Sequence, residues 1–177
     1  MKRVLFATLW FFLVAVAMAE PISFPGAVSV AQSPTEQFAL VWVEATADQP
    51  HQLKLRLANG ELRPVMNIER HATIHWAPSG EQFAVTDAFA SDQSRVIAYS
   101  VSENGAATEL PIQLPECVTH LLKSNHHSYL KVSGWSQHGL KLVASGYGAN
   151  SRKSFCQSIV CNLSTTKTLL CGENHDC

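Results

Sequence analysis

The chain has 177 residues, a formal net charge of -1 and only 15% charged side chains. Nucleic-acid binding needs a basic patch or stripe, and the sequence contains no run of like charge that would form one. Apolar residues make up 46% of the chain, which excludes general disorder. We expect one domain over residues 20–177, because about 158 residues is an ordinary size for a single domain.

Residues 1–19 have the three parts of a secretory signal. Lys2 and Arg3 form a basic start, an uncharged and largely apolar run follows, and Ala17-Met18-Ala19 fits the small-x-small cleavage pattern. The apolar run has about 14 residues, which is shorter than the roughly 20 needed to cross a bilayer as a helix. We therefore expect a cleaved, exported protein, periplasmic or secreted, that keeps no membrane span. An uncleaved anchor is the alternative.

Parts of the sequence recur at a fixed offset. The segment EQFAL at 36–40 returns 45 residues later as EQFAV at 81–85, and Asn59-Gly60 returns at the same offset as Asn104-Gly105. A third copy is indicated further on, where Trp135 corresponds to Trp76. Such self-similarity is typical of repeat architectures. The predicted repeats cover 27–66, 71–114 and 129–171, with an insertion at 114–128.

Each repeat is predicted to contain four short β-strands, because apolar runs alternate with turn residues at intervals of about 10 to 12. In the second repeat the expected strands are 72–76, 82–87, 96–101 and 108–113. Asn104-Gly105 suits a type I′ turn, in which both central residues have positive φ. Helix signals are poor except at 115–123, where one or two turns are allowed.

The segment WAPSGEQFA at 76–84 resembles the W-[ST]-P-[DS]-G-x-x-[ILF]-[AV] stretch of a TolB-like or WD40-like β-propeller blade. The resemblance covers 27–170, although the first repeat lacks the tryptophan and the glycine, and the third has Gln137-His138 where proline and aspartate would stand. It implies an all-β fold of three four-stranded antiparallel blades, a partial β-propeller. A β-sandwich is the alternative. It also implies a non-catalytic binding or scaffolding module that engages a protein or an envelope component.

Three blades are fewer than the four to eight that usually close a propeller. A three-bladed fragment would leave sheet edges unpaired, and such edges invite association. We hypothesise that two copies form a homodimer and complete a six-bladed ring.

Consecutive hairpin loops alternate between the two ends of the strands, so the longer loops and the insertion share one end. Long loops on a rigid scaffold often carry binding residues, and this end is the expected binding face. A plain solvated surface is the alternative. The candidate binding residues are Glu44, Asp48, Asp87, Asp92, Tyr147, Arg152 and Lys153. The candidate metal ligands are His120, His126 and His127, because histidine is the commonest metal ligand.

Catalytic motifs are poorly represented, and we predict no catalytic residue and no cofactor. The segment 134–138 falls one residue short of a G-x-S-x-G elbow and lies at a strand-to-strand turn. His71 and His75 lie about 13 Å apart along a predicted strand, so one metal ion cannot bind both. The alternative function is a small exported hydrolase or metal-dependent enzyme that uses the loop histidines and aspartates.

All five cysteines lie in the C-terminal third, and an exported chain meets an oxidising compartment. Cys156 and Cys161 would point to opposite faces of one strand and cannot bond to each other. A hairpin turning near residues 165–167 would place Cys161 opposite Cys171 and Cys156 near Cys177, so we predict these two disulfides. Cys117 is then free or pairs with another molecule. A zinc site is the alternative, but no C-x-x-C spacing supports it.

Overall fold

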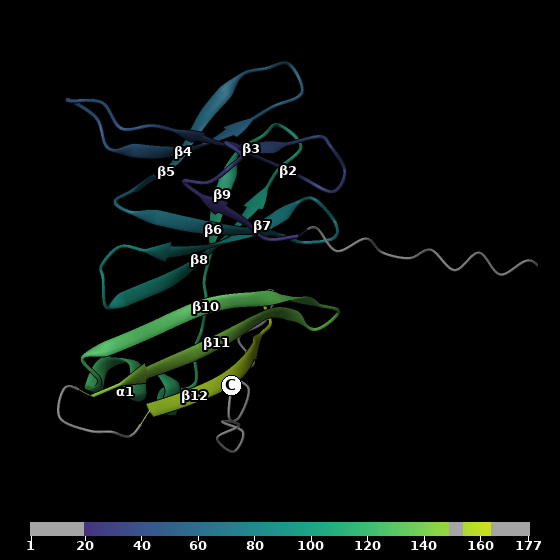
Figure 1. Ribbon diagram of the computed structural model, residues 1–177. Helices are drawn as coiled ribbons and strands as arrows, with labels where there is room; N and C mark the ends of the chain where they lie inside the picture. Colours follow the sequence, from purple (N-terminus) through teal and green to yellow (C-terminus); the bar gives the residue numbers. More distant parts are fainter. Residues whose placement is uncertain (1–19, 149–153, 164–177) are drawn as a thin grey trace, which may run out of the picture.

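The computed structural model of the protein describes residues 20–148 and 154–163. Within these ranges the chain forms twelve strands and one short helix (Figure 1), which confirms the all-β prediction. The sheets are antiparallel apart from one short parallel pairing. Several predicted features lie outside the described residues, namely the export signal, the fourth strand of the third repeat, Arg152, Lys153, Cys171 and Cys177.

The first sheet consists of four strands that neighbour one another in chain order. Its strands are Val30–Gln32 (β2), Ala39–Val43 (β3), His51–Arg56 (β4) and Leu62–Ile68 (β5). Alternate side chains point to opposite faces of a strand. Leu40 and Trp42 of β3 therefore lie on one face with their β4 partners Leu55 and Leu53, and all four are buried. This apolar face packs against the second sheet.

The other eight strands are hydrogen-bonded into one sheet, but Gln93–Val101 (β8) and His127–Ser136 (β10) share only a two-residue parallel pairing, so we describe the strands before and after it as the second and third sheets. The second sheet contains four strands in chain order and a fifth, β1, added at the β6 edge. Its strands are Ile22–Phe24 (β1), His71–Trp76 (β6), Gln82–Ala88 (β7), Gln93–Val101 (β8) and Ala107–Leu110 (β9). All four strands predicted for the second repeat are present, with ends displaced by at most three residues. The strand β1 was not predicted, because its pairing of Phe24 with Ala72 joins residues far apart in the sequence.

The third sheet comprises His127–Ser136 (β10), Gly139–Tyr147 (β11) and Ser154–Cys161 (β12). The strand β10 begins parallel to β8 and then crosses the second sheet, where the Val132 N–H donates to the Thr86 hydroxyl at 3.0 Å. The insertion forms a helix, Glu116–Ser124 (α1), and Val118 is its buried residue. No helix among the described residues is long and apolar enough to cross a membrane.

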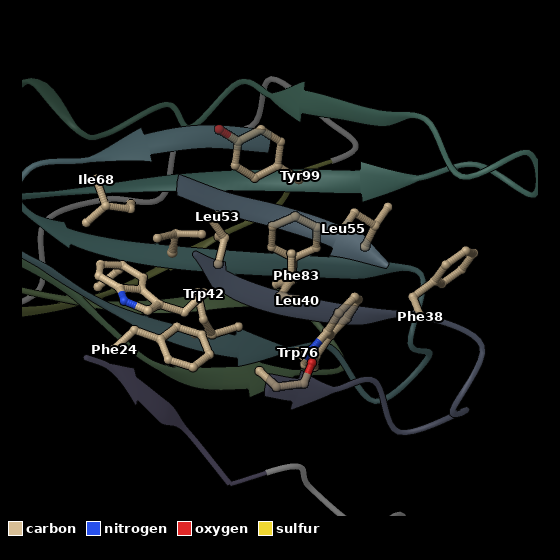
Figure 2. Close-up of a cluster of buried hydrophobic side chains, with 14 of the residues drawn as sticks. Phe24, Phe38, Leu40, Trp42, Leu53, Leu55, Ile68, Trp76, Phe83 and Tyr99 are labelled. Carbon is tan, nitrogen blue, oxygen red and sulfur yellow. Dashed lines mark hydrogen bonds between the residues drawn. The ribbon is translucent and has the colours of Figure 1, made fainter. Parts of the chain in front are cut away.

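Two buried apolar clusters hold the sheets together. The first lies between the first and second sheets (Figure 2), and Phe83 occupies its middle with ring centroids 5.0 Å from both Trp76 and Tyr99. The second cluster lies between the second and third sheets and includes Trp135 and Leu142. Since the second sheet contributes to both clusters, it is the middle layer of the stack (Figure 1).

Two tryptophans join neighbouring sheets in the same way. The indole N–H of Trp76 donates to the Ala31 carbonyl of the first sheet at 3.0 Å, and that of Trp135 donates to the His75 carbonyl of the second sheet at 3.1 Å. In the strand register Gln32 pairs with Ala39 as Trp76 pairs with Phe83, so Gln32 occupies the position of Trp76 in the first sheet. Each indole therefore binds the preceding sheet close to its own equivalent position.

The prediction of a type I′ turn at Asn104-Gly105 is wrong. Glu36 is the one non-glycine among the described residues with positive φ, so Asn104 does not have the backbone conformation that this turn needs. The Gly105 N–H donates to the Ser102 carbonyl, and Gly105 has φ 77°. This is a type I turn followed by a residue with positive φ, the usual arrangement of a slightly longer hairpin loop. In the first repeat Glu36, with φ 60°, occupies the corresponding position that Gly80 takes in the second.

The predicted disulfide between Cys161 and Cys171 is wrong, because Cys161 is a free, buried thiol. Its sulfur faces the core between the second and third sheets, 3.7 Å from the Gln113 carbonyl oxygen, and burial raises the pKa of the thiol. Cys117 and Cys156 are both disulfide-bonded. The prediction that Cys117 is free or pairs with another molecule is therefore wrong as well, and among the described cysteines the free one is Cys161.

Candidate metal centre and binding face

Three segments meet where β10 begins: the loop before β8, the residues after α1 and the end of β11. They bring together Asp92, His126 and His127, whose ligand atoms all lie within 4.8 Å of one another. The Nδ1 atom of His126 is 3.6 Å from a carboxylate oxygen of Asp92, and the two imidazole rings have centroids 5.0 Å apart. Two imidazoles and one carboxylate thus form a compact cluster.

Hydrogen bonds of β10 position this cluster. The Ser128 N–H donates to the Asp92 carbonyl at 3.0 Å, next to the parallel pairing of Ser128 with Gln93. On the other side of β10, His127 pairs with Tyr147 of β11, and their rings stack with centroids 4.2 Å apart and planes inclined by 16°. Asp92 and His127 are therefore fixed by the sheet framework.

The two histidines differ in their surroundings. The Nδ1 atom of His127 is buried and has no hydrogen-bond partner among the described residues. Buried polar atoms in proteins nearly always have a hydrogen-bond partner, so this nitrogen is available to bind a ligand. The side chain of His126 is 63% exposed and follows the helix C-cap at Asn125. One imidazole is held in place, and the other is free to adjust.

The structure brings together two of the three predicted metal ligands. His120 is exposed on α1 and does not belong to the cluster. Asp92, which was predicted as a binding residue, takes its place. Asp92 lies beside the two histidines because the parallel pairing of β8 with β10 brings together segments that are more than thirty residues apart in the sequence.

Two of the predicted acidic binding residues, Glu44 and Asp48, lie in the loop between β3 and β4. Glu44 accepts a hydrogen bond from the Trp42 indole at 3.0 Å and contacts His51 at 3.2 Å. Asp48 is exposed in the same loop. Neither residue belongs to the Asp92, His126 and His127 cluster.

Asp87 was predicted to belong to the exposed binding face, and this is wrong. The residue is only 1% exposed. Every second residue of a strand points to the same face, so Asp87 shares with Phe83 and Val85 the face of β7 that packs on the first sheet. One of its carboxylate oxygens accepts a hydrogen bond from Nε of Arg95 at 2.9 Å and lies 2.9 Å from a terminal nitrogen of the same guanidinium, with which it forms an ion pair. Asp87 is thus a buried residue that forms an ion pair with Arg95 and is not part of an exposed binding surface.

A pocket of about 250 Å³ lies beside the cluster, between β6, β7 and β10. His71 and His75 line it from the same face of β6, and Ser91 and Gln93 on either side of Asp92 line it as well. Burial lowers the pKa of His75. The pocket lies between the second and third sheets, because β6 and β7 belong to the second sheet and β10 to the third.

We expect His75 to make the protein less stable in mild acid. A histidine with a lowered pKa in the folded state binds fewer protons there than in the unfolded state, so the free energy of unfolding falls as the pH drops below the ordinary value of about 6.5. His75→Gln should therefore lose less stability than the wild type between pH 7.5 and pH 5.5 in urea unfolding. His138→Gln, at an exposed histidine, is the control. An unchanged pH slope in His75→Gln would contradict this expectation.

A larger pocket of about 980 Å³ lies at the opposite end of the strands, between the turns of the first and second repeats. Its lining includes Phe38 and two carboxylates, Glu81 and Glu103. The sequence analysis did not identify it, although its lining contains Asn59 and Asn104 of the recurring Asn-Gly turns. These turns share one end of the molecule, as the alternation of hairpin loops predicts.

The fold and the site define the protein as an all-β chain of stacked antiparallel sheets with a histidine-aspartate cluster at the loop end. Comparison with known proteins found no matching family model, no matching curated protein and no matching solved structure.

Proposed function

We propose that the protein is an exported, non-catalytic binding module whose loop end engages a protein or an envelope component. The observation that carries this proposal is the setting of Tyr147, an aromatic side chain that is 46% exposed beside Asp92, His126 and His127. Aromatic residues are enriched in protein interfaces and often supply most of the binding energy, whereas the surrounding rim is polar. Tyr147 would be the anchor and the cluster part of the rim.

The architecture supports the same proposal. We infer that the stacked sheets are blades of a partial β-propeller, in line with the resemblance of residues 76–84 to a TolB-like blade. Rigid sheets joined by two apolar clusters would present the loop end as a fixed surface.

A metal-dependent enzyme is the second candidate function. Catalytic zinc sites commonly use three protein ligands and leave the fourth position open, and the cluster offers three ligand groups. This function would require metal-dependent turnover of a substrate, whereas a binding module would not.

The binding proposal predicts position-specific crosslinking. A photo-reactive amino acid at position 147, in the full chain expressed in its native host, should give a discrete crosslink to one envelope component or protein. The same probe at Leu62, a residue of β5 that is also 46% exposed, is the matched control and should give none.

The mass of the product separates the alternatives. A product containing two copies of the chain would instead support the six-bladed ring. Equal products at both positions, or none at either, would contradict binding through the loop end.

A further inference from the structure

The cluster at the start of β10 combines the side chains that divalent transition-metal ions prefer. Imidazole nitrogen suits zinc, copper and nickel, and a carboxylate oxygen completes many zinc sites. Calcium and magnesium bind through oxygen ligands and would gain little from two imidazoles. Asp92, His126 and His127 therefore select for a metal of the zinc class.

The arrangement of the two histidines is unusual for adjacent residues. Successive side chains of a strand point to opposite faces, yet the rings of His126 and His127 have centroids only 5.0 Å apart. His127 is the first residue of β10, and His126 lies before it in the segment that leaves α1. The chain changes direction at this point, and both imidazoles reach Asp92.

The unpartnered nitrogen of His127 is a second and independent observation. Its Nδ1 atom is buried without a hydrogen bond to any described residue, although a stacked Tyr147 ring and the pairing with β11 fix the side chain. A buried nitrogen that lacks a partner costs free energy. A metal ion bound to it, or to a water that it holds, would remove this cost.

We propose that Asp92, His126 and His127 form a binding site for one zinc-class cation, with the remaining coordination position open to water or to a side chain of a partner. Ligand atoms about 2.0–2.1 Å from a tetrahedral zinc ion lie about 3.4 Å apart, and the three groups are within 4.8 Å of one another. The site must contract on binding, and the exposed His126 side chain provides this movement. The site does not depend on the proposed partner, since all its ligands belong to this chain.

Isothermal titration of the full-length, tag-free and oxidised protein with zinc chloride tests the site. We expect one zinc ion per chain. Asp92→Asn and His126→Ala should each weaken binding by at least about 100-fold, because even partners that only orient metal ligands contribute about 10- to 100-fold. His120→Ala should bind zinc as the wild type does, since His120 lies outside the cluster.

A second readout guards against misfolded variants. Zinc should raise the melting temperature of the wild type and of His120→Ala but not of Asp92→Asn or His126→Ala, while far-ultraviolet circular dichroism of all four stays the same. The proposal is overturned if the folded wild type binds no zinc, or if binding survives both Asp92→Asn and His126→Ala. Crosslinking from position 147 does not require the metal, so the two proposals can fail separately.

Discussion

Phe83→Ala is expected to lower the free energy of unfolding by about 3–5 kcal/mol. Phe83 is fully buried in the middle of the cluster between the first and second sheets, where its ring contacts those of Trp76 and Tyr99 (Figure 2). The substitution removes the ring and leaves a cavity, because close-packed sheets collapse only partly around it. Urea unfolding followed by tryptophan fluorescence measures the change.

Val28→Ala is the control for this substitution. Val28 is 52% exposed, so its truncation should change the stability by less than about 0.5 kcal/mol. If Phe83→Ala were no more destabilising than Val28→Ala, the first and second sheets would not pack through this cluster.

Arg95→Met is expected to cost about 3 kcal/mol of stability, because it leaves the buried Asp87 carboxylate without its ion-pair partner. Asp87 has one oxygen bound to Arg95, and the other has no partner among the described residues. Methionine has no cationic group, so the contact between the Arg95 guanidinium and the Phe89 ring, 5.3 Å from Cζ to the ring centroid, is lost as well. The measured loss therefore combines the uncompensated carboxylate charge with this cation–π contact.

Asp87→Asn is the matched variant for this ion pair and should cost less than Arg95→Met. Removing the charge from the buried side leaves a guanidinium on a side chain that is 56% exposed, and water can solvate it. Chemical denaturation of both variants at pH 7 gives the comparison. A larger loss in Asp87→Asn would show that the Arg95 charge, and not the carboxylate, is the one in need of its partner.

Features that depend on local sequence were predictable. The strands of the second repeat follow from alternating apolar residues and turn chemistry, and these signals lie within a few residues of each element. The burial of Asp87 was also open to prediction, because the alternation through Phe83 and Val85 continues to it. It was missed because an aspartate at the end of a strand was assigned to the loop surface.

Features that depend on distant pairing were not predictable from one sequence. Neither β1 nor the parallel contact of β8 with β10 has a local signal, since each joins segments whose separation the sequence does not specify. The same limit explains the candidate site. The two adjacent histidines were recognised, but Asp92 could be assigned to them only once β10 was placed beside β8.

The hydrogen bonds from the tryptophan indoles to backbone carbonyls all run the same way, from each sheet to the one before it in the chain. Trp76 and Trp135 each bind the sheet before their own, and Gln32 stands at the position where the first repeat would carry such an indole. The first sheet therefore has no indole at this position. In a ring of two copies, the first sheet of one chain would have to follow the third sheet of the other. Both intermolecular junctions would then lack the bond that each internal junction has.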